Sequence, residues 1–230
     1  MNFIFILVKP AVPENIGASA RAIKTMGFDD LRIVDSEKHL EPQAKILAHG
    51  STDIVDNIKH FDSLEEAISD IDFVIAATAR KRTRLTDYHT IEDTVEIVEK
   101  KRKSIKSVGI VFGSEESGLS NADIQLCDML STVSLKKPYP SLNLSQAVMI
   151  YAYAFSKFID KKSPKQKDTK NADSWKVLQK NISQLLIEID INPSDLIYTR
   201  IMERVALLGD TDINLLHSVI AAVNKKMNGE

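Results

Sequence analysis

The sequence predicts an α/β protein with a largely parallel sheet, followed by a smaller helical segment. Short apolar runs rich in β-branched and aromatic residues alternate with helical patterns over the first two thirds of the chain. Beyond residue 160 only helical spacing is found. A chain of 230 residues has room for one domain of roughly 150 residues and an appendage.

Each element of the first part is marked by its local pattern. Five short apolar runs are expected strands, at residues 3–8, 31–34, 73–77, 108–112 and 132–135. Helical spacing is expected at residues 16–26, 44–49 and 64–68. Pro10 and Pro13 separate the first strand from its helix, and Gly27 takes the place of a C-cap glycine. This alternation of strands and helices implies parallel strand pairing.

The last third of the chain is predicted to be helical. Residues 144–158 form a helix that is apolar on more than one side, and the charged segment after it contains Pro164 and reads as an exposed linker. Trp175 begins another helical pattern, Asn192 and Pro193 favour a helix start, and Asp212 is a possible cap for a third helix. We therefore divide the chain into residues 1–160, a linker at 161–172 and a helical extension at 173–230.

Composition excludes several classes of protein. Hydrophobic residues make up 43% of the chain and charged residues 27%, and no run approaches the roughly 20 apolar residues of a membrane span. Residues 1–8 read as a strand rather than a signal peptide, so we expect a cytoplasmic protein. Cys127 is the only cysteine, and the five histidines lack ligand spacing. We predict no metal.

Charge and motif content narrow the ligands. The net charge of −2 argues against a generic nucleic-acid binder, so any RNA surface must be local, with candidates at residues 80–84, 100–103 and 136–137. The glycine fingerprints of dinucleotide and nucleoside-triphosphate sites are missing. An apolar strand ends instead at Gly113, where open α/β sheets bind ligands. Gly113 and Gly118 either admit a ligand close to the backbone or permit tight turns.

Three segments carry the functional prediction. They are Asn-Ile-Gly-Ala-Ser-Ala-Arg at residues 15–21, Phe-Gly-Ser-Glu-Glu-Ser-Gly-Leu at residues 112–119, and Ser-Leu-Asn-Leu-Ser-Gln-Ala-Val at residues 141–148. In this order they resemble the three motifs of the SpoU/TrmH branch of the SPOUT RNA 2'-O-methyltransferases, closest to the TrmJ-like subgroup. The resemblance covers roughly residues 3–158, so function is better supported than the role of the tail.

The resemblance implies a SPOUT-type sheet with a C-terminal trefoil knot, and a homodimer with its sites at the interface. It implies S-adenosyl-L-methionine as methyl donor and a ribose 2'-hydroxyl as acceptor, at nucleotide 32 (cytidine or uridine) of the tRNA anticodon loop. Ribosomal RNA is an alternative acceptor. A knotted RNA-binding dimer without catalysis and a small-molecule α/β enzyme are further alternatives; the latter predicts activity without RNA.

The resemblance also assigns residues. The catalytic set is Arg21, Asn15, Glu115, Ser141 and Asn143, and the cofactor-binding set is Thr78, Ala79, Gly113, Val133, Ser141, Leu142 and Asn143. A guanidinium with a pKa above about 12 is a poor general base, so we favour an electrostatic role for Arg21. Glu115 is expected to orient Asn15 or Arg21, or simply to favour a helix start.

Simpler structural roles compete with some of these assignments. Asn15 could be only the N-cap of its helix, and Ser141 is a helix cap on physical grounds alone. Val133 is placed on the strand that leads into the third motif. An exposed salt bridge is the ordinary role of a helical arginine such as Arg21.

Overall fold

The computed structural model describes residues 1–79, 87–137, 141–159 and 174–227. The contacts divide the chain into two compact units, one of Met1–Val95 with Ser107–Lys165 and one of Glu96–Lys106 with Gln166–Glu230. The predicted linker at 161–172 and the basic segment at 80–84 lie outside the described residues. None of the described helices is long and apolar enough to cross a membrane.

The first unit is built on a seven-stranded sheet in which all strand pairs are parallel, in the order β3-β2-β1-β6-β4-β7-β5. This confirms the predicted α/β class. The strands are β1 (Asn2–Val8), β2 (Asp30–Val34), β3 (Lys59–Phe61), β4 (Phe73–Ala77), β5 (Tyr88–Thr90), β6 (Ser107–Phe112) and β7 (Met129–Thr132).

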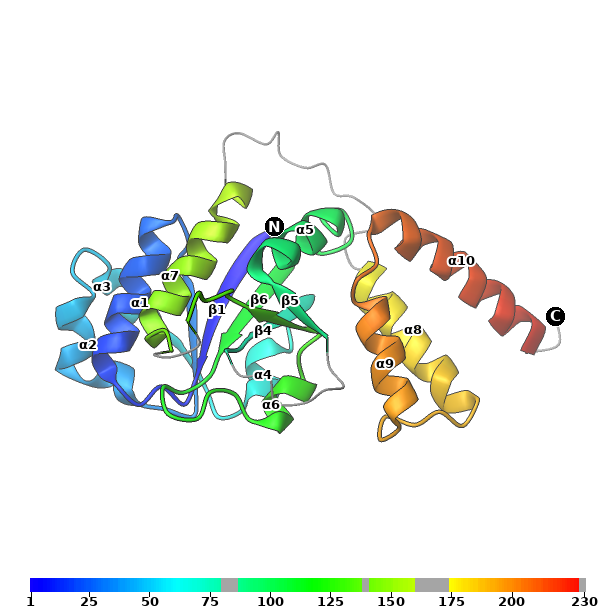
Figure 1. The fold of residues 1–230 in the computed structure, drawn as a ribbon, viewed down its shortest axis with the longest axis horizontal. Coiled ribbons are helices and arrows are strands. Elements are labelled where there is room, and N and C mark those ends of the chain that lie inside the picture. Colours follow the sequence, from blue (N-terminus) through cyan, green and yellow to red (C-terminus); the bar gives the residue numbers. More distant parts are fainter. Residues whose placement is uncertain (80–86, 138–140, 160–173, 228–230) are drawn as a thin grey trace. The chain divides into compact units, whose positions relative to one another are not determined.

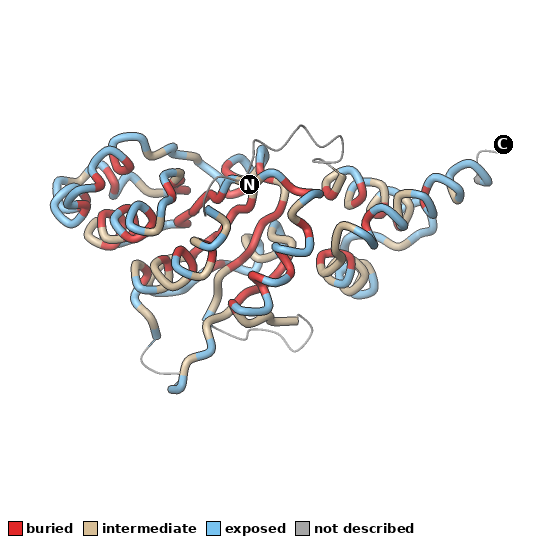
Figure 2. The backbone as a smooth tube through the Cα atoms, turned by 90° about the horizontal axis from the view of Figure 1, so that it is seen from above, coloured by how far each residue is buried: buried red, intermediate tan, exposed pale blue. Residues whose placement is uncertain are grey.

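Helices cover both faces of this sheet (Figure 1). They are α1 (Pro13–Thr25), α2 (Pro42–Leu47), α3 (Thr52–Asp56), α4 (Leu64–Ile68), α5 (Ile91–Lys100), α6 (Asn121–Gln125) and α7 (Leu144–Phe155), with short 3₁₀ turns at Lys38–Leu40 and Ser156–Phe158. In β1, Ile4 and Ile6 pack in one cluster with residues of α4. Phe3 packs instead against Phe155 of α7, with the two ring centroids 5.1 Å apart. The central strands are buried along most of their length, as Figure 2 shows. Burial on both faces explains why their sequences are continuously apolar.

The structure corrects two predicted elements. The expected strand at 132–135 lies at Met129–Thr132, because Asp128 pins its start: the Asp128 carboxylate accepts the Val74 amide at 2.7 Å, and the Asp128 amide donates to the Val74 carbonyl at 2.8 Å. Val133 therefore follows β7 rather than lying on it.

Helix α9 (Leu196–Val205) begins after Asp195, because the Asn192 and Asp195 amides close a turn around Pro193.

The second unit contains α8 (Ser174–Glu188), α9 and α10 (Asp210–Met227), together with residues 96–106. Its buried centre includes Lys101, whose side chain is 0% exposed; Nζ donates to the Leu208 carbonyl at 2.5 Å and lies 4.0 Å from the ring centroid of Trp175. The Asp210 carboxylate accepts the Lys103 amide at 3.1 Å. The prediction of a basic RNA patch at 100–103 is therefore wrong for Lys101, because this lysine anchors the helical tail.

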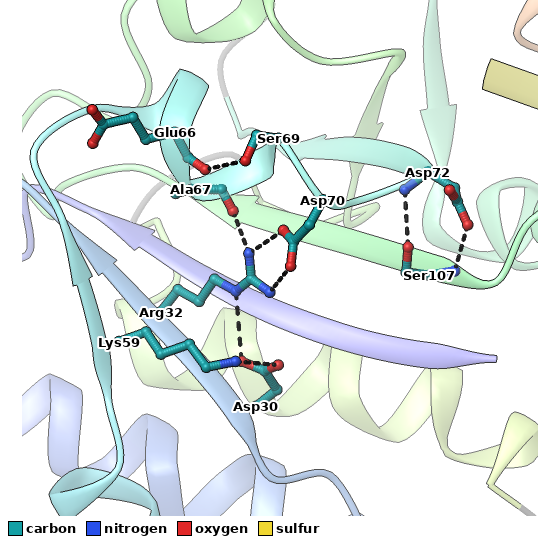
Figure 3. Close-up of polar contacts among 9 residues, drawn as sticks. All are labelled: Asp30, Arg32, Lys59, Glu66, Ala67, Ser69, Asp70, Asp72 and Ser107. Atoms are coloured by element: carbon teal, nitrogen blue, oxygen red, sulfur yellow. Dashed lines mark hydrogen bonds and ion pairs between the residues drawn. The ribbon is translucent and has the colours of Figure 1, made fainter. Parts of the chain in front are cut away.

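A second buried cation ties the first unit together on the side of the sheet shown in Figure 3. Arg32 of β2 is buried, and its guanidinium donates to both carboxylate oxygens of Asp70, at 2.5 and 2.9 Å, and to the Ala67 carbonyl at 2.7 Å. Asp30 lies 3.6 Å from its Nε atom. The network joins β2 to the end of α4, so it fixes one strand against the helical layer.

We expect Asp70→Asn to lower the free energy of unfolding by about 1 kcal/mol, because it removes a charged acceptor from the buried Arg32 guanidinium. The effect is no larger because the Asp70 side chain is 64% exposed and solvent screens its charge. The hydrogen bond from Arg32 lowers the pKa of Asp70 from its ordinary 3.8. This contribution is therefore present above about pH 4 and is lost as the pH falls through the folded-state pKa. Urea unfolding at neutral and acid pH measures it.

The control is Asp56→Asn, which removes an exposed carboxylate that pairs with Lys45 at 2.6 Å. That change should alter the free energy of unfolding by less than about 0.5 kcal/mol. Equal effects of the two substitutions at neutral pH, or a difference that does not shrink in acid, would contradict a stabilising role for the Arg32 network.

Candidate active site

The candidate site lies at the carboxyl ends of four adjacent parallel strands. The registers Leu7↔Phe112, Ala77↔Phe112 and Ala77↔Ser131 align the ends of β1, β6, β4 and β7 in one row. The loop after β1 leads into the first motif, and Gly113 follows β6 directly. Thr78 and Val133 follow β4 and β7 in the same row. Segments far apart in the sequence are thus brought to one edge of the sheet.

Glu115 is the acceptor on which the first two motifs converge. Its Oε2 atom accepts the Ala11 amide at 2.9 Å, and its Oε1 atom accepts the Val12 amide at 3.4 Å and the Asn15 side-chain amide at 2.7 Å. Three donors around one carboxylate hold it in a fixed orientation. This confirms the expected contact with Asn15, while no hydrogen bond to Arg21 is found among the described residues.

Asn15 lies inside α1 and is not its cap. The N-cap is Val12, which makes no side-chain capping bond, and Pro13 opens the helix. Asn15 is buried, and its Oδ1 atom accepts a hydrogen bond from Asn143 Nδ2 at 2.8 Å. The capping interpretation was wrong because proline at the first position starts the helix at Pro13, three residues before the predicted start at Ile16.

Asn143 is the N-cap of α7, the role that capping propensity suggested for Ser141. Its Oδ1 atom accepts the Ser145 amide at 2.9 Å and the Ser145 hydroxyl at 2.7 Å, and the Gln146 side chain accepts the Asn143 amide at 3.1 Å. Ser141 is exposed and stands outside this arrangement. The signal that identifies the cap is the Gln three residues after Asn143, a capping box.

One chain of hydrogen bonds therefore joins all three motifs, from Ser145 to Asn143, to Asn15 and to Glu115. Every donor points toward the carboxylate, so each side-chain amide has a defined orientation. A primary amide carries two hydrogens, and these bonds use one on each asparagine. Among the residues that the structure describes, no hydrogen bond uses the second hydrogen of either amide, so each can donate to a polar acceptor group beside the network.

Gly113 is required by the turn of the second motif itself. A Cβ atom at this position would lie 2.1 Å from the Gly118 carbonyl carbon and 2.1 Å from the Leu119 amide nitrogen. Gly118 adopts a φ of 68°, and Ser114 pairs with it in an isolated bridge. Of the two interpretations of these glycines, the geometry supports the tight turn, and that turn places Glu115.

Arg21 lies apart from this network. It is exposed on α1, and its backbone carbonyl accepts a hydrogen bond from the Thr25 hydroxyl at 2.8 Å. Among the described residues its guanidinium makes no hydrogen bond or ion pair. A single chain therefore brings Asn15, Glu115 and Asn143 together but leaves the predicted catalytic arginine outside.

The predicted cofactor residues fit an apolar group with a few polar contacts. Thr78 and Leu142 are half-buried and Ala79 is exposed, and the Thr78 amide donates to the Ser131 carbonyl at 2.9 Å. Beneath them the Ser131 hydroxyl accepts from Thr94 at 2.8 Å. Backbone groups at strand ends with small side chains around them suit a nucleoside ligand.

Several residues near the strand ends were not anticipated from the sequence. Lys9 and Asp35 follow β1 and β2, each with a φ of 51°, and their side chains pair at 3.0 Å. Left-handed backbone costs a non-glycine residue about 1–2 kcal/mol, more than an exposed ion pair usually contributes. A lysine or aspartate at a strand end carries no sequence signal for this conformation.

The single cysteine has a structural role. Burial raises the pKa of the Cys127 thiol well above its ordinary value, and Sγ donates to the Asp123 carbonyl at 3.3 Å. The neutral, partly buried thiol packs against the core cluster that contains Ile4 and Ile6. Among the residues that the structure describes, no group of three or more His, Cys, Asp or Glu side chains could hold a metal ion.

The fold and the motif network define an α/β methyltransferase site, and comparison with known proteins identifies the family. The model of the SpoU rRNA methylase family matches residues 2–153, and that of the LasT tRNA/rRNA methyltransferase C-terminal domain matches residues 172–227. The chain belongs to the SpoU family of RNA methyltransferases. This membership confirms the expected SPOUT fold class, the enzyme class of RNA 2'-O-methyltransferase and S-adenosyl-L-methionine as methyl donor.

Individual relatives agree. The uncharacterized tRNA/rRNA methyltransferase LasT of Escherichia coli K12 is 41% identical over 227 residues, 99% of each chain. The tRNA (cytidine-2'-O-)-methyltransferase TrmJ of Methanocaldococcus jannaschii is 34% identical over 67% of this chain and 70% of its own. The crystal structure of TrmJ from Z. mobilis superposes with a TM-score of 0.66 and 27% identity, covering 98% of this chain and 100% of that one.

We expect Gly113→Ala to weaken binding of S-adenosyl-L-methionine by about tenfold or more, because the added Cβ overlaps the backbone of Gly118 and Leu119. Calorimetric titration with the donor measures the affinity, and thermal unfolding reports any loss of stability. Gly50→Ala is the control for backbone strain alone, since Gly50 has a left-handed φ of 76° but a Cβ there meets nothing within 4 Å. Unchanged donor affinity in a folded Gly113→Ala protein would show that this turn does not shape the donor site.

Proposed function

We propose that this chain transfers a methyl group from S-adenosyl-L-methionine to the ribose 2'-hydroxyl of nucleotide 32, cytidine or uridine, in the tRNA anticodon loop. Relatives named TrmJ support tRNA as the acceptor, including the tRNA (cytidine/uridine-2'-O-)-methyltransferase of Yersinia enterocolitica, 34% identical over 66% of this chain. Nucleotide 32 rests on the resemblance to the TrmJ-like subgroup.

The observation that carries the proposal is the hydrogen-bond chain from Asn143 through Asn15 to Glu115. Methyl transfer from a sulfonium requires the acceptor oxygen in line with the methyl group and little covalent assistance, so positioning dominates the catalytic contribution. Two asparagine amides with fixed orientations, each with one free hydrogen, can hold the acceptor ribose or an adjacent phosphate oxygen.

The donor, when bound, supplies an electrophilic methyl group on a positively charged sulfur. The backbone at Thr78, Gly113 and Val133, with Leu142, would hold its nucleoside part, and Ser141 would lie at the rim. Glu115 has its oxygens occupied by three donors, so it acts by orienting Asn15 rather than as a proton acceptor. Arg21 would stabilise the negative charge that develops on the 2'-oxygen.

Ribosomal RNA is the second candidate acceptor, supported by the name of the matching family model. A non-catalytic RNA-binding dimer is disfavoured because side chains of all three motifs take part in the network. The proposed organisation keeps residues 1–160 as the methyltransferase domain, 161–172 as a linker and 173–230 as a helical extension. Action on tRNA would place the protein in the cytoplasm.

The test is transfer of radiolabelled methyl from S-adenosyl-L-methionine to unmodified tRNA transcripts and, separately, to ribosomal RNA. We expect labelled 2'-O-methylcytidine or 2'-O-methyluridine from tRNA, lost when nucleotide 32 carries a 2'-deoxyribose. Label in ribosomal RNA alone would replace the substrate and keep the chemistry. Label in neither RNA, with the donor bound, would overturn the proposed function.

We further propose that the enzyme acts as a homodimer in which Arg21 completes the site of the other subunit. A hollow of about 570 Å³ lies between the ends of α1 and α7, lined by Thr25, Met26, Tyr153, Ala154, Ser156, Lys157 and Ile159. Tyr153 is 70% exposed and Ile159 43% exposed. Arg21 lies one turn from Thr25, on the same side of α1. A second copy that covers this hollow, whose lining is partly apolar and partly polar, would bury Arg21 beside it.

Subunit mixing tests this arrangement. Arg21→Ala and Asn15→Ala should each abolish methyl transfer, while an equimolar mixture that has exchanged subunits should regain about a quarter of the wild-type rate, because half of the dimers carry one intact site. Donor binding by Arg21→Ala should remain near wild type. No recovery in a mixture shown to contain heterodimers would place Arg21 in its own subunit's site.

A further inference from the structure

Lys9 and Asp35 are held at the edge of the sheet that carries the site. The Lys9 amide donates to the Val34 carbonyl at 2.8 Å, and the Asp35 amide donates to the Phe61 carbonyl at 3.0 Å. These bonds continue the strand ladder one residue past β1 and β2. The Ser36 hydroxyl donates to the Pro10 carbonyl at 2.8 Å and ties the two loops together. Both side chains therefore stand on a fixed backbone.

Stability does not account for this arrangement. The Lys9 and Asp35 side chains are 65% and 57% exposed, and an ion pair in that environment gains little. Lys9 nevertheless adopts a left-handed φ that residues other than glycine, asparagine and aspartate rarely take, and Asp35 has the same φ as a residue type that tolerates it. Backbone conformations that cost stability without a compensating contact are concentrated at functional sites.

The position of Lys9 points to the acceptor RNA. The Ala11 amide, two residues after Lys9, donates to Glu115, so Lys9 lies on the loop that contacts the motif network. Asp123 of α6, the helix that follows the second motif, adds to the field of Asp35 around the ammonium group and favours its charged form. An exposed, permanently charged lysine beside a ribose-binding site has the chemistry to contact a phosphate.

We propose that Lys9 contacts a backbone phosphate of the acceptor RNA, next to the ribose that is methylated, and that Asp35 holds the ammonium group in place until RNA replaces it. This inference rests on the proposed function, since it names a substrate contact of that site. Asp35 then has a second effect: its carboxylate repels the incoming polyanion and weakens binding.

Four single substitutions test the proposal in the full-length protein, with binding of an unmodified tRNA transcript measured over a range of salt concentrations. Lys9→Gln should raise Kd about 3- to 10-fold and reduce the magnitude of the salt slope by about one, as expected for one lost phosphate contact. Lys9→Arg should restore both values. Asp35→Asn, which keeps a residue tolerant of left-handed backbone, should lower Kd about threefold.

The matched control is Lys59→Gln. Lys59 begins β3, at the opposite end of the strands, and its exposed ammonium group pairs with Asp30 at 3.4 Å, so the substitution removes the same charge away from the site. It should leave the salt slope unchanged. Equal slopes for Lys9→Gln and wild type, or equal losses in Lys9→Gln and Lys59→Gln, would overturn the role of Lys9.

These outcomes are separable from failure of the proposed function. Methyl transfer by the wild-type protein decides the function, whereas the salt slope decides the Lys9 contact. Thermal unfolding of each variant identifies a folding defect. If Lys9→Gln unfolds, Lys9→Asn, which tolerates the left-handed backbone, removes the same charge and gives the same expected slope.

Discussion

The carboxylate of Glu115 is the point on which the arrangement of the site depends. It accepts hydrogen bonds from the loop after β1 and from Asn15 in α1, and through Asn15 it is connected to the cap of α7. The hydrogen bonds that join these segments connect residues 100 to 128 positions apart in sequence. Their alignment requires parallel strands whose ends lie in one row, and a glycine turn after β6 that leaves no room for a side chain at Gly113.

Local patterns were sufficient for much of the fold. The apolar runs identified β1, β2, β4 and β6, because these strands are buried on both faces and leave a continuous hydrophobic signal. The strand at Met129 was displaced in the prediction because its limits depend on Asp128 and Val74, a pairing between distant segments. The three-residue strands β3 and β5 were missed, since so few residues cannot show a period.

The site shows the same division. The family resemblance indicated Asn15, Glu115 and Asn143, yet only the fold shows that they form one chain of hydrogen bonds. Asn143 rather than Ser141 caps α7, and the capping box with Gln146 was the sequence signal for it. Lys9 and Asp35 had no sequence signal, because a left-handed backbone at a lysine depends on the neighbouring strand. The trefoil knot and the position of nucleotide 32 stay predictions, as neither follows from the contacts described.

The use of cations links the fold to the substrate. The chain has a net charge of −2, and Lys101 and Arg32 are buried in structural contacts, so neither contributes to an RNA surface. Affinity for a polyanion then depends on where the remaining cations stand, because counterion release counts only those that meet phosphates. In the proposed homodimer, each exposed cation is present once in each subunit. In the proposed homodimer, RNA would bind selectively where Lys9 and Arg21 of the partner subunit lie near the motif network, and weakly elsewhere.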